Sequence, residues 1–201
     1  MIFFCINREG NLANVIKRIF DFFLAGTLGI LFLIPMLLIA LAVKLSSKGP
    51  VIFWSERVGK NNQLFWMPKF RTMRIDTPNV ATHLLASANQ YLTPIGGFLR
   101  KSSLDELPQL WSVLVGKMSF VGPRPALFNQ TDLIEMRTVV GVQQLTPGIT
   151  GWAQVNGRDE LDLATKVQFD QQYLLKRSMG LDIQILWMTG VKVFRREGVS
   201  H

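Results

Sequence analysis

The stretch FFLAGTLGILFLIPMLLIALAV, residues Phe22–Val43, decides the architecture of this chain because its 22 residues carry no charge. At about 1.5 Å per residue, a straight helix of this length would reach about 33 Å and could cross a hydrocarbon core of about 30 Å. The run is longer than the apolar core of a cleaved signal peptide, and no small-residue cleavage site follows it. It therefore predicts a permanent membrane anchor.

Two features of this run argue against a simple crossing. Pro35 lies inside it, and proline bends or breaks a helix because it lacks a backbone N–H. Both flanks are basic, and the positive-inside rule places both on the cytoplasmic side. The residues alone leave two geometries open, a re-entrant helix and a kinked spanning helix. The basic flanking residues are Arg8, Lys17, Arg18, Lys44, Lys48, Arg57 and Lys60.

Composition predicts one domain plus an attachment and an anionic partner. The 201 residues include 22 Lys and Arg against 14 Asp and Glu, a net charge of +8. Residues 49–201 alone hold 17 basic and 12 acidic side chains, so this part carries +5. Because 48% of residues are hydrophobic and 18% charged, a membrane surface fits better than a nucleic acid. We expect an arm and membrane helix over 1–48 and a cytoplasmic domain over 49–201.

Local patterns predict a mixed fold, mainly α, with a small β-hairpin. The hairpin pairs Val51–Trp54 with Leu64–Phe70 around the turn residues Gly59–Asn62. Helices are expected over Ser103–Leu114, Asn129–Gln144 (irregular), Leu161–Arg177 and Leu181–Arg196, a loop or weak helix over Asp76–Asn89, and loops over Gly116–Pro125 and Thr146–Gly151.

The last of these helices, Leu181–Arg196, has an apolar face and a basic end. Ile183, Trp187 and Phe194 lie near one face of it. Such a helix either lies in the membrane interface or covers the core of the domain.

Adjacent carboxylates in Ser103-Leu-Asp-Glu-Leu-Pro-Gln109 form the first candidate for chemistry. A purely structural interpretation is available, since Ser103 followed by Glu106 is the pattern of a capping box. The functional interpretation is that Asp105 or Glu106 holds a hard cation or attacks phosphorus.

Three further patterns place cations and glycines where phosphates could bind. Arg124 lies between Pro123 and Pro125, a stiff setting that suits a guanidinium for bidentate phosphate binding. Lys69-Phe-Arg-Thr-Met73 is a basic patch that could equally contact lipid headgroups. The glycines of Pro147–Arg158 allow close backbone approach to a ligand, although a simple turn needs them too.

Together, and in this order after Lys17-Arg18-x-x-Asp21, these strings resemble the monotopic phosphoglycosyl transferases, the bacterial sugar transferase family. The likeness runs from about Lys17 to the end. It favours the re-entrant geometry, a monotopic protein whose N-terminal helix is broken at proline and which carries interfacial amphipathic helices. Two positions depart from the family pattern: Ile34 replaces the usual Ser before the proline, and Ser55 replaces the usual Gln of the hairpin motif.

The resemblance implies transfer of a sugar phosphate from a UDP-sugar to undecaprenyl phosphate, with release of UMP, at the cytoplasmic leaflet of a bacterial inner membrane. Asp105 matches the family nucleophile. Glu106 matches its partner, which would assist metal placement or take a proton from the polyprenyl phosphate, and one or both carboxylates would hold Mg²⁺. The small size resembles members that use N-acetylated sugars, and it says nothing of the oligomeric state. The substrate contacts implied are Lys69, Arg71, Arg100, Arg124, Gln154 and Arg158.

Two rival hypotheses are kept. In the first, Asp105 only holds metal and the lipid phosphate attacks the donor directly, without a covalent intermediate. In the second, the chain is a non-catalytic module that binds anionic lipid. Binding to nucleic acid is disfavoured, because the aromatic residues do not alternate with the basic ones as a stacking platform requires.

Overall fold

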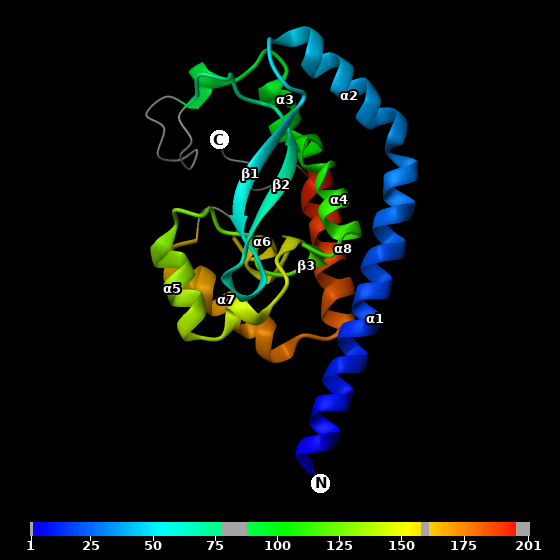
Figure 1. Cartoon of the computed structure of the whole chain (residues 1–201), viewed down its shortest axis with the longest axis vertical. Coiled ribbons are helices and arrows are strands. Elements are labelled where there is room, and N and C mark those ends of the chain that lie inside the picture. Colours follow the sequence, from blue (N-terminus) through cyan, green and yellow to red (C-terminus); the bar gives the residue numbers. More distant parts are fainter. Residues whose placement is uncertain (1, 78–87, 158–160, 196–201) are drawn as a thin grey trace.

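A computed structural model describes residues 2–77, 88–157 and 161–195 of the chain (Figure 1). Two helices, α1 (Ile2–Leu31) and α2 (Leu33–Ser46), form a bent arm along one side of the domain. The axes of Leu12–Leu31 and α2 differ by 62°. The bend lies at Phe32, three residues before Pro35, where the proline ring crowds the preceding turn. The expected break is therefore present.

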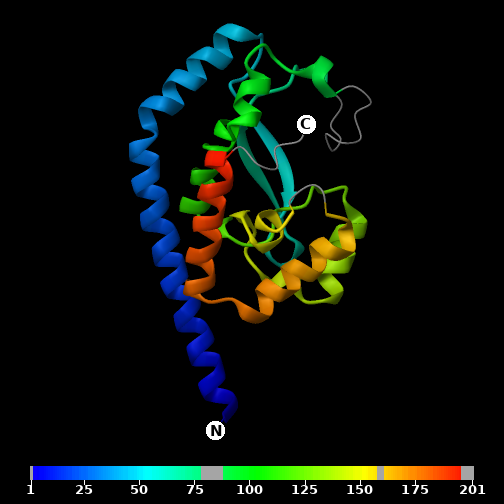
Figure 2. The same ribbon diagram turned by 180° about the vertical axis from the view of Figure 1, so that it is seen from behind.

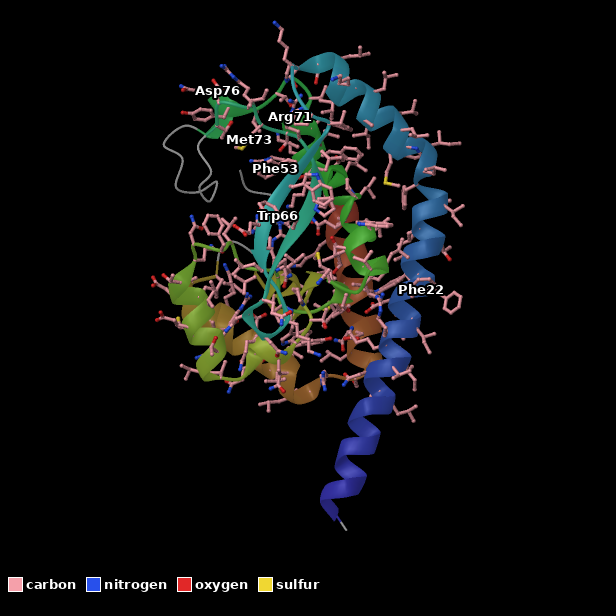
Figure 3. The ribbon with its side chains drawn as sticks, in the orientation of Figure 1. Phe22, Phe53, Trp66, Arg71, Met73 and Asp76 are labelled. Carbon is pink, nitrogen blue, oxygen red and sulfur yellow. The ribbon has the colours of Figure 1, made fainter. Side chains whose placement is uncertain are left out.

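No single helix in the described ranges is long and apolar enough to cross a bilayer, whereas the bent pair passes that test when its two halves are taken together. The arm exposes apolar side chains on its outer surface, and Figure 3 shows Phe22 pointing away from the domain. Ala25 and Val43 on the inner surface are completely buried. The arm thus packs on the domain with one face and exposes an apolar one.

The hairpin forms as predicted. Strands β1 (Ile52–Val58) and β2 (Leu64–Phe70) pair antiparallel, with Phe53 opposite Lys69. The connection is the short 3₁₀ helix η1 (Lys60–Asn62), in which Asn61 has φ 54°. Asparagine tolerates this left-handed conformation better than most residues, so the turn chemistry was readable from the sequence.

A second sheet corrects the sequence analysis. Strands β3 (Ser119–Val121) and β4 (Gly148–Thr150) pair in parallel, although both lie in segments expected to be loops. A Cβ on Gly148 would lie 2.2 Å from the backbone nitrogen of Gly122, so only glycine allows this approach. Glycine and proline suggested turns, whereas here they permit close contact between two distant segments.

The helices confirm most expectations and correct one. Helix α7 (Leu163–Lys176) begins at Asp162, whose side chain accepts a hydrogen bond from the backbone of Thr165. The predicted helix Ser103–Leu114 is instead divided at Pro108 into the 3₁₀ turn η4 (Leu104–Glu106) and helix α4 (Gln109–Leu114). The other elements are η3 (Ala88–Tyr91), α3 (Gly96–Lys101), α5 (Thr131–Val139), η5 (Val142–Gln144), α6 (Trp152–Val155) and α8 (Met179–Arg195).

Helix α8 covers the core and also exposes apolar residues. Ile185 is fully buried in the main cluster, whereas Trp187 is 74% exposed. From behind, α8 runs alongside α1 (Figure 2). The interpretation that this helix covers the core is therefore confirmed, whereas a position of its exposed side in the membrane interface stays a prediction.

A polar junction fixes α1 on the domain. The ammonium of Lys17 forms a 2.5 Å ion pair with Asp182 of α8, and the same carboxylate accepts a 2.6 Å hydrogen bond from the Tyr173 hydroxyl. Arg18 donates to the Val113 and Leu114 carbonyls at the end of α4. These contacts set the position of α4, which follows the carboxylate pair directly.

Candidate active site

The carboxylate pair lies on η4, a turn whose shape the neighbouring residues determine. Ser103 has φ 56°, in the left-handed region, and Pro108 prevents η4 from continuing into α4. No side-chain hydrogen bond caps the turn, so the capping box is absent. Asp105 is 8% exposed. The chain therefore buries a carboxylate here without the stabilisation that a normal helix start would give.

Glu106 binds two cations brought from distant segments. Lys69 of β2 and Arg124 each form a 2.8 Å ion pair with its Oε1 atom. Arg124 follows β3 in the proline-flanked loop and is 38% exposed, so part of its guanidinium faces solvent. Three of the predicted motifs thus converge on one cluster.

The two carboxyl groups respond to this cluster in opposite ways. Burial alone would raise the pKa of Glu106, but the charges of Arg124 and Lys69 and their hydrogen bonds outweigh burial and hold that pKa well below its usual range. For Asp105 burial dominates and raises the pKa to about 6, against the opposing charge of Lys69. Burial also lowers the pKa of Lys69. At pH 7 Glu106 is a fixed anion and Asp105 an ionised, poorly solvated one.

Arg100, at the end of α3, lies on the Asp105 side of the cluster. Its Nε donates to the hydroxyl of Thr72 at 3.1 Å, and burial lowers its pKa while the charge of Asp105 opposes that shift. The structure therefore brings Asp105, Glu106, Lys69, Arg100 and Arg124 together.

Arg71 lies outside this cluster, contrary to the sequence-based expectation. Its guanidinium donates to the Lys48 and Ser47 carbonyls, at 2.6 and 2.8 Å, just beyond the end of α2. Figure 3 shows it at that end of the hairpin. Strand β2 ends at Phe70, so the alternation that would put residues i and i+2 on one face does not extend to Arg71. Arg71 joins the membrane arm to the hairpin.

Of the two implied substrate contacts in the Pro147–Arg158 segment, Gln154 and Arg158, the structure describes Gln154. Both polar atoms of the Gln154 side chain are buried without a hydrogen-bond partner. The Nε2 atom of Gln109, which is 2% exposed, is also buried without one. Buried amides are normally paired, so these groups mark places for a ligand or water. Arg158 lies outside the described residues.

Sequence reasoning did not assign Arg57 and Ser55 to the site. Arg57, on β1, interacts electrostatically with Arg124 and Glu106, and its Nε donates to the Ser55 hydroxyl at 2.9 Å. Ser55 and Arg57 are two residues apart on β1, and Phe53, two residues before Ser55, pairs with Lys69 of β2. This spacing puts Ser55 and Arg57 on the face of the hairpin that carries Lys69, and it was the sequence signal for their place in the site.

The carboxylate pair also fits a hard divalent cation. Among the described residues no group of three or more His, Cys, Asp or Glu is placed to hold a metal ion. Mg²⁺ commonly uses only one or two carboxylates and completes its shell with water and phosphate oxygens. Both ion pairs of Glu106 use Oε1, which leaves Oε2 outside them. Asp105 and Glu106 are therefore the candidate protein ligands for such an ion.

The fold and the site define a class of protein, in which an apolar bent arm carries a domain whose buried carboxylate pair lies among cations. The family model described as bacterial sugar transferase matches residues 12–196. This chain belongs to that family.

Characterised relatives agree with this assignment. An undecaprenyl-phosphate glucose phosphotransferase of Komagataeibacter xylinus is 43% identical over 86% of this chain and 35% of its own length. A UDP-glucose:undecaprenyl-phosphate glucose-1-phosphate transferase of Escherichia coli (strain K12) is 42% identical over 90% of this chain and 40% of its own. The exopolysaccharide production protein ExoY of Rhizobium meliloti (strain 1021) is 36% identical over 89% of this chain and 85% of its own length. The chain spans between a third and a half of the first relatives' length.

Proposed function

We propose that this chain transfers a sugar 1-phosphate from a UDP-sugar to undecaprenyl phosphate, giving undecaprenyl-diphosphate sugar and UMP. The observation that carries the proposal is the buried cluster of Asp105 and Glu106 among Lys69, Arg100 and Arg124. Both substrates are anionic phosphates, and preorganised cations stabilise the charge that develops when phosphoryl groups transfer. The names of the relatives support the same donor and acceptor.

Asp105 is the proposed nucleophile. One of its oxygens bonds to the β-phosphorus while the bond from that phosphorus to the bridging oxygen breaks, and UMP leaves with the electron pair. An oxygen of undecaprenyl phosphate then attacks the same phosphorus and releases the Asp105 carboxylate. Burial, which raises the pKa of Asp105 to about 6, leaves it ionised and poorly solvated at pH 7, a state that favours attack.

Glu106 is better suited to positioning than to accepting a proton. Its low pKa, held down by Arg124 and Lys69, makes it a weak base. We assign it to orienting these two cations and, with Asp105, to holding Mg²⁺. The metal would supply further neutralisation of phosphate charge. Excess chelator should remove activity and added Mg²⁺ should restore it, whereas full activity in chelator would contradict the metal assignment.

The decisive experiment separates covalent from direct transfer. The purified chain is given a UDP-sugar without any lipid acceptor, and UMP is measured. A covalent phosphosugar intermediate on Asp105 predicts release of up to one UMP per enzyme and ping-pong kinetics. Direct transfer predicts no UMP until undecaprenyl phosphate is added. A chain that releases none with both substrates present would instead support a non-catalytic lipid-binding module.

The sugar is tested in the same assay with a panel of donors. Relatives are named for glucose or galactose, and the sequence analysis predicted an N-acetylated sugar, so the panel includes UDP-glucose, UDP-galactose and UDP-N-acetylglucosamine. The donor with the highest kcat/KM identifies the sugar.

For the membrane arm we propose a re-entrant geometry on the cytoplasmic face of the inner membrane. The 62° bend, the exposed apolar outer face and the basic residues at both ends support it. Cysteines introduced at Asn7 and Ser47, in a chain lacking Cys5, should both resist an impermeant thiol reagent added outside intact cells. In Pro35→Ala a fraction should become labelled at position 7, because the straightened helix can span. Labelling of position 7 without that substitution would contradict re-entry.

A further inference from the structure

Arg57 is a half-buried cation whose hydrogen-bond partners are neutral. Its Nε donates to the Ser55 hydroxyl at 2.9 Å and its NH1 to the Pro125 carbonyl at 3.3 Å. Within the described part of the chain, no carboxylate forms an ion pair with it. Burial and the charge of Arg124 lower its pKa to about 10, so it remains charged at pH 7. A partly buried charge of this kind is costly until an anion joins it.

Arg137, which also contacts the proline-flanked loop of Arg124, has its positive charge neutralised by a carboxylate. Its NH1 donates to the Arg124 carbonyl at 2.8 Å, one residue before the carbonyl that Arg57 contacts. Unlike Arg57, it also binds the Asp170 carboxylate, at 2.9 and 2.6 Å. Both arginines contact the backbone of the same loop, yet of the two only Arg137 forms a direct ion pair, while Arg57 meets the more distant charge of Glu106. The long 3.3 Å contact of Arg57 with the loop leaves the rest of its guanidinium available to an anion.

The position of Arg57 identifies which anion it would meet. Next to it on β1, the backbone N–H of Val58 donates to the Ala126 carbonyl, so the hairpin and the Arg124 loop are joined here. An open pocket adjoins this junction and is lined by Val58, Arg124 and Gln143. The Oε1 atom of Gln143 is buried without a hydrogen-bond partner. A nucleoside has the polar ring edges to pair with such an atom, whereas a polyprenyl chain has none.

We infer that Arg57 and Arg124 together bind the phosphate that leaves with the nucleotide, and that Ser55 is a positioning residue which orients Arg57. The inference rests on the proposed function and adds a binding residue to it. As the bond between the β-phosphorus and the bridging oxygen breaks, negative charge moves to the phosphate of UMP. Two guanidinium groups there neutralise that charge, as charge-assisted hydrogen bonds to phosphate do.

The test measures UMP binding to the full chain in detergent by calorimetry, together with separate KM values for the two substrates. Removing a charge-assisted contact of about 1.5–3 kcal/mol, Arg57→Met should weaken UMP binding by about 10- to 100-fold and raise the KM for UDP-sugar. The KM for undecaprenyl phosphate should stay within about twofold. Arg57→Lys keeps the charge but loses the planar fork, so its UMP affinity should fall between the two.

Ser55→Ala and a matched control complete the set. Ser55→Ala removes one orienting hydrogen bond of about 1 kcal/mol and should weaken UMP binding about three- to tenfold, without effect in an Arg57→Met background. Lys60→Met removes an exposed positive charge from the same hairpin and should leave UMP binding unchanged. Thermal melting of each variant shows that it is folded.

Three outcomes would overturn the assignment. Unchanged UMP affinity in folded Arg57→Met excludes Arg57 as a nucleotide contact. A raised KM for undecaprenyl phosphate alone would assign Arg57 to the acceptor instead. If the unsubstituted chain neither binds UMP nor releases it from UDP-sugar, the proposed function itself fails, a result distinct from the other two.

Discussion

Two buried polar regions of this molecule differ in how far their cations and anions are paired with each other. At the junction of α1 with the domain, Lys17 meets Asp182, Asp182 meets Tyr173, and Arg18 meets backbone carbonyls. Each cation there has a near acceptor, and burial together with the charge of Asp182 raises the pKa of Tyr173. The arrangement resembles that of a structural core.

In the cluster around Asp105 and Glu106, by contrast, the charges are not matched one to one. It holds more cations than anions, a carboxyl group with a raised pKa and a left-handed Ser103. These features cost stability and are found mostly where a ligand or transition state compensates them. The comparison teaches that buried charge alone does not mark a site, whereas incompletely compensated buried charge does.

The largest expected effect is in the cluster. Asp105→Asn removes the nucleophile while nearly preserving shape, and turnover should fall by about 10³-fold or more, as for other reactions that lose a covalent group. The thermal midpoint should not fall, because the substitution removes a poorly solvated charge. The measurement is UMP release together with thermal melting. Activity within tenfold of the unsubstituted chain would remove Asp105 from the role of nucleophile.

The junction should show the opposite behaviour. Asp182→Ala leaves Lys17 and the Tyr173 hydroxyl without their partner and should cost about 3 kcal/mol of unfolding free energy. For a domain of this size the midpoint should fall by about 6–12 °C. Turnover per folded molecule should stay within about threefold. If turnover is lost while the melting curve is unchanged, the junction has a role in function, and the distinction between a structural junction and a catalytic cluster is wrong.

The pH dependence sharpens the contrast between the two carboxyl groups of the cluster. Because burial raises the pKa of Asp105 to about 6, turnover should fall with a midpoint near pH 6 as the nucleophile is protonated. Glu106 adds no loss in this range, since its pKa lies well below it. A profile flat down to pH 5 would contradict the raised pKa.

The contribution of Asp105 to folding stability should change with pH in the opposite sense to turnover. A carboxyl group whose pKa is raised on folding binds more protons in the folded state, so its contribution to stability falls as pH rises from about 4 to about 6. At 1.36 kcal/mol per unit, the shift from 3.8 to about 6 corresponds to about 3 kcal/mol. The stability of Asp105→Asn relative to the unsubstituted chain should therefore increase over this range. Melting curves at several pH values in the presence of chelator measure it.

The features that could be predicted from the sequence are those that depend on local patterns. The anchor and the hairpin follow from local patterns: an uncharged run, a proline and alternating strands around Gly59–Asn62. The motifs also identified Asp105, Glu106, Lys69, Arg100 and Arg124, which the structure brings together. The role of each in catalysis stays a prediction.

The errors share one physical cause, which is contact between distant segments. The parallel pairing of β3 with β4 joins residues about 30 positions apart and has no local periodicity. Arg71 was grouped with Lys69 because they are close in sequence, yet it binds the end of α2. Arg57 and Ser55 were not assigned to the site, because the contact that joins β1 to the Arg124 loop links residues far apart in sequence.

The smallest predicted effect concerns the backbone beneath the carboxylate pair. If Ser103 acted as a helix N-cap, its hydroxyl would accept a hydrogen bond from a backbone N–H, and both Gly and Val would lose that bond. The structure shows φ 56° and no side-chain cap at Ser103. Glycine adopts this conformation freely, whereas a β-branched residue is strained there by about 1–2 kcal/mol. Ser103→Gly should therefore lie within about 0.5 kcal/mol of the unsubstituted chain, and Ser103→Val should be less stable by more than 1 kcal/mol. Chemical denaturation of the two variants measures the difference. Equal stability of the Gly and Val variants would mean that residue 103 does not hold the left-handed conformation in solution.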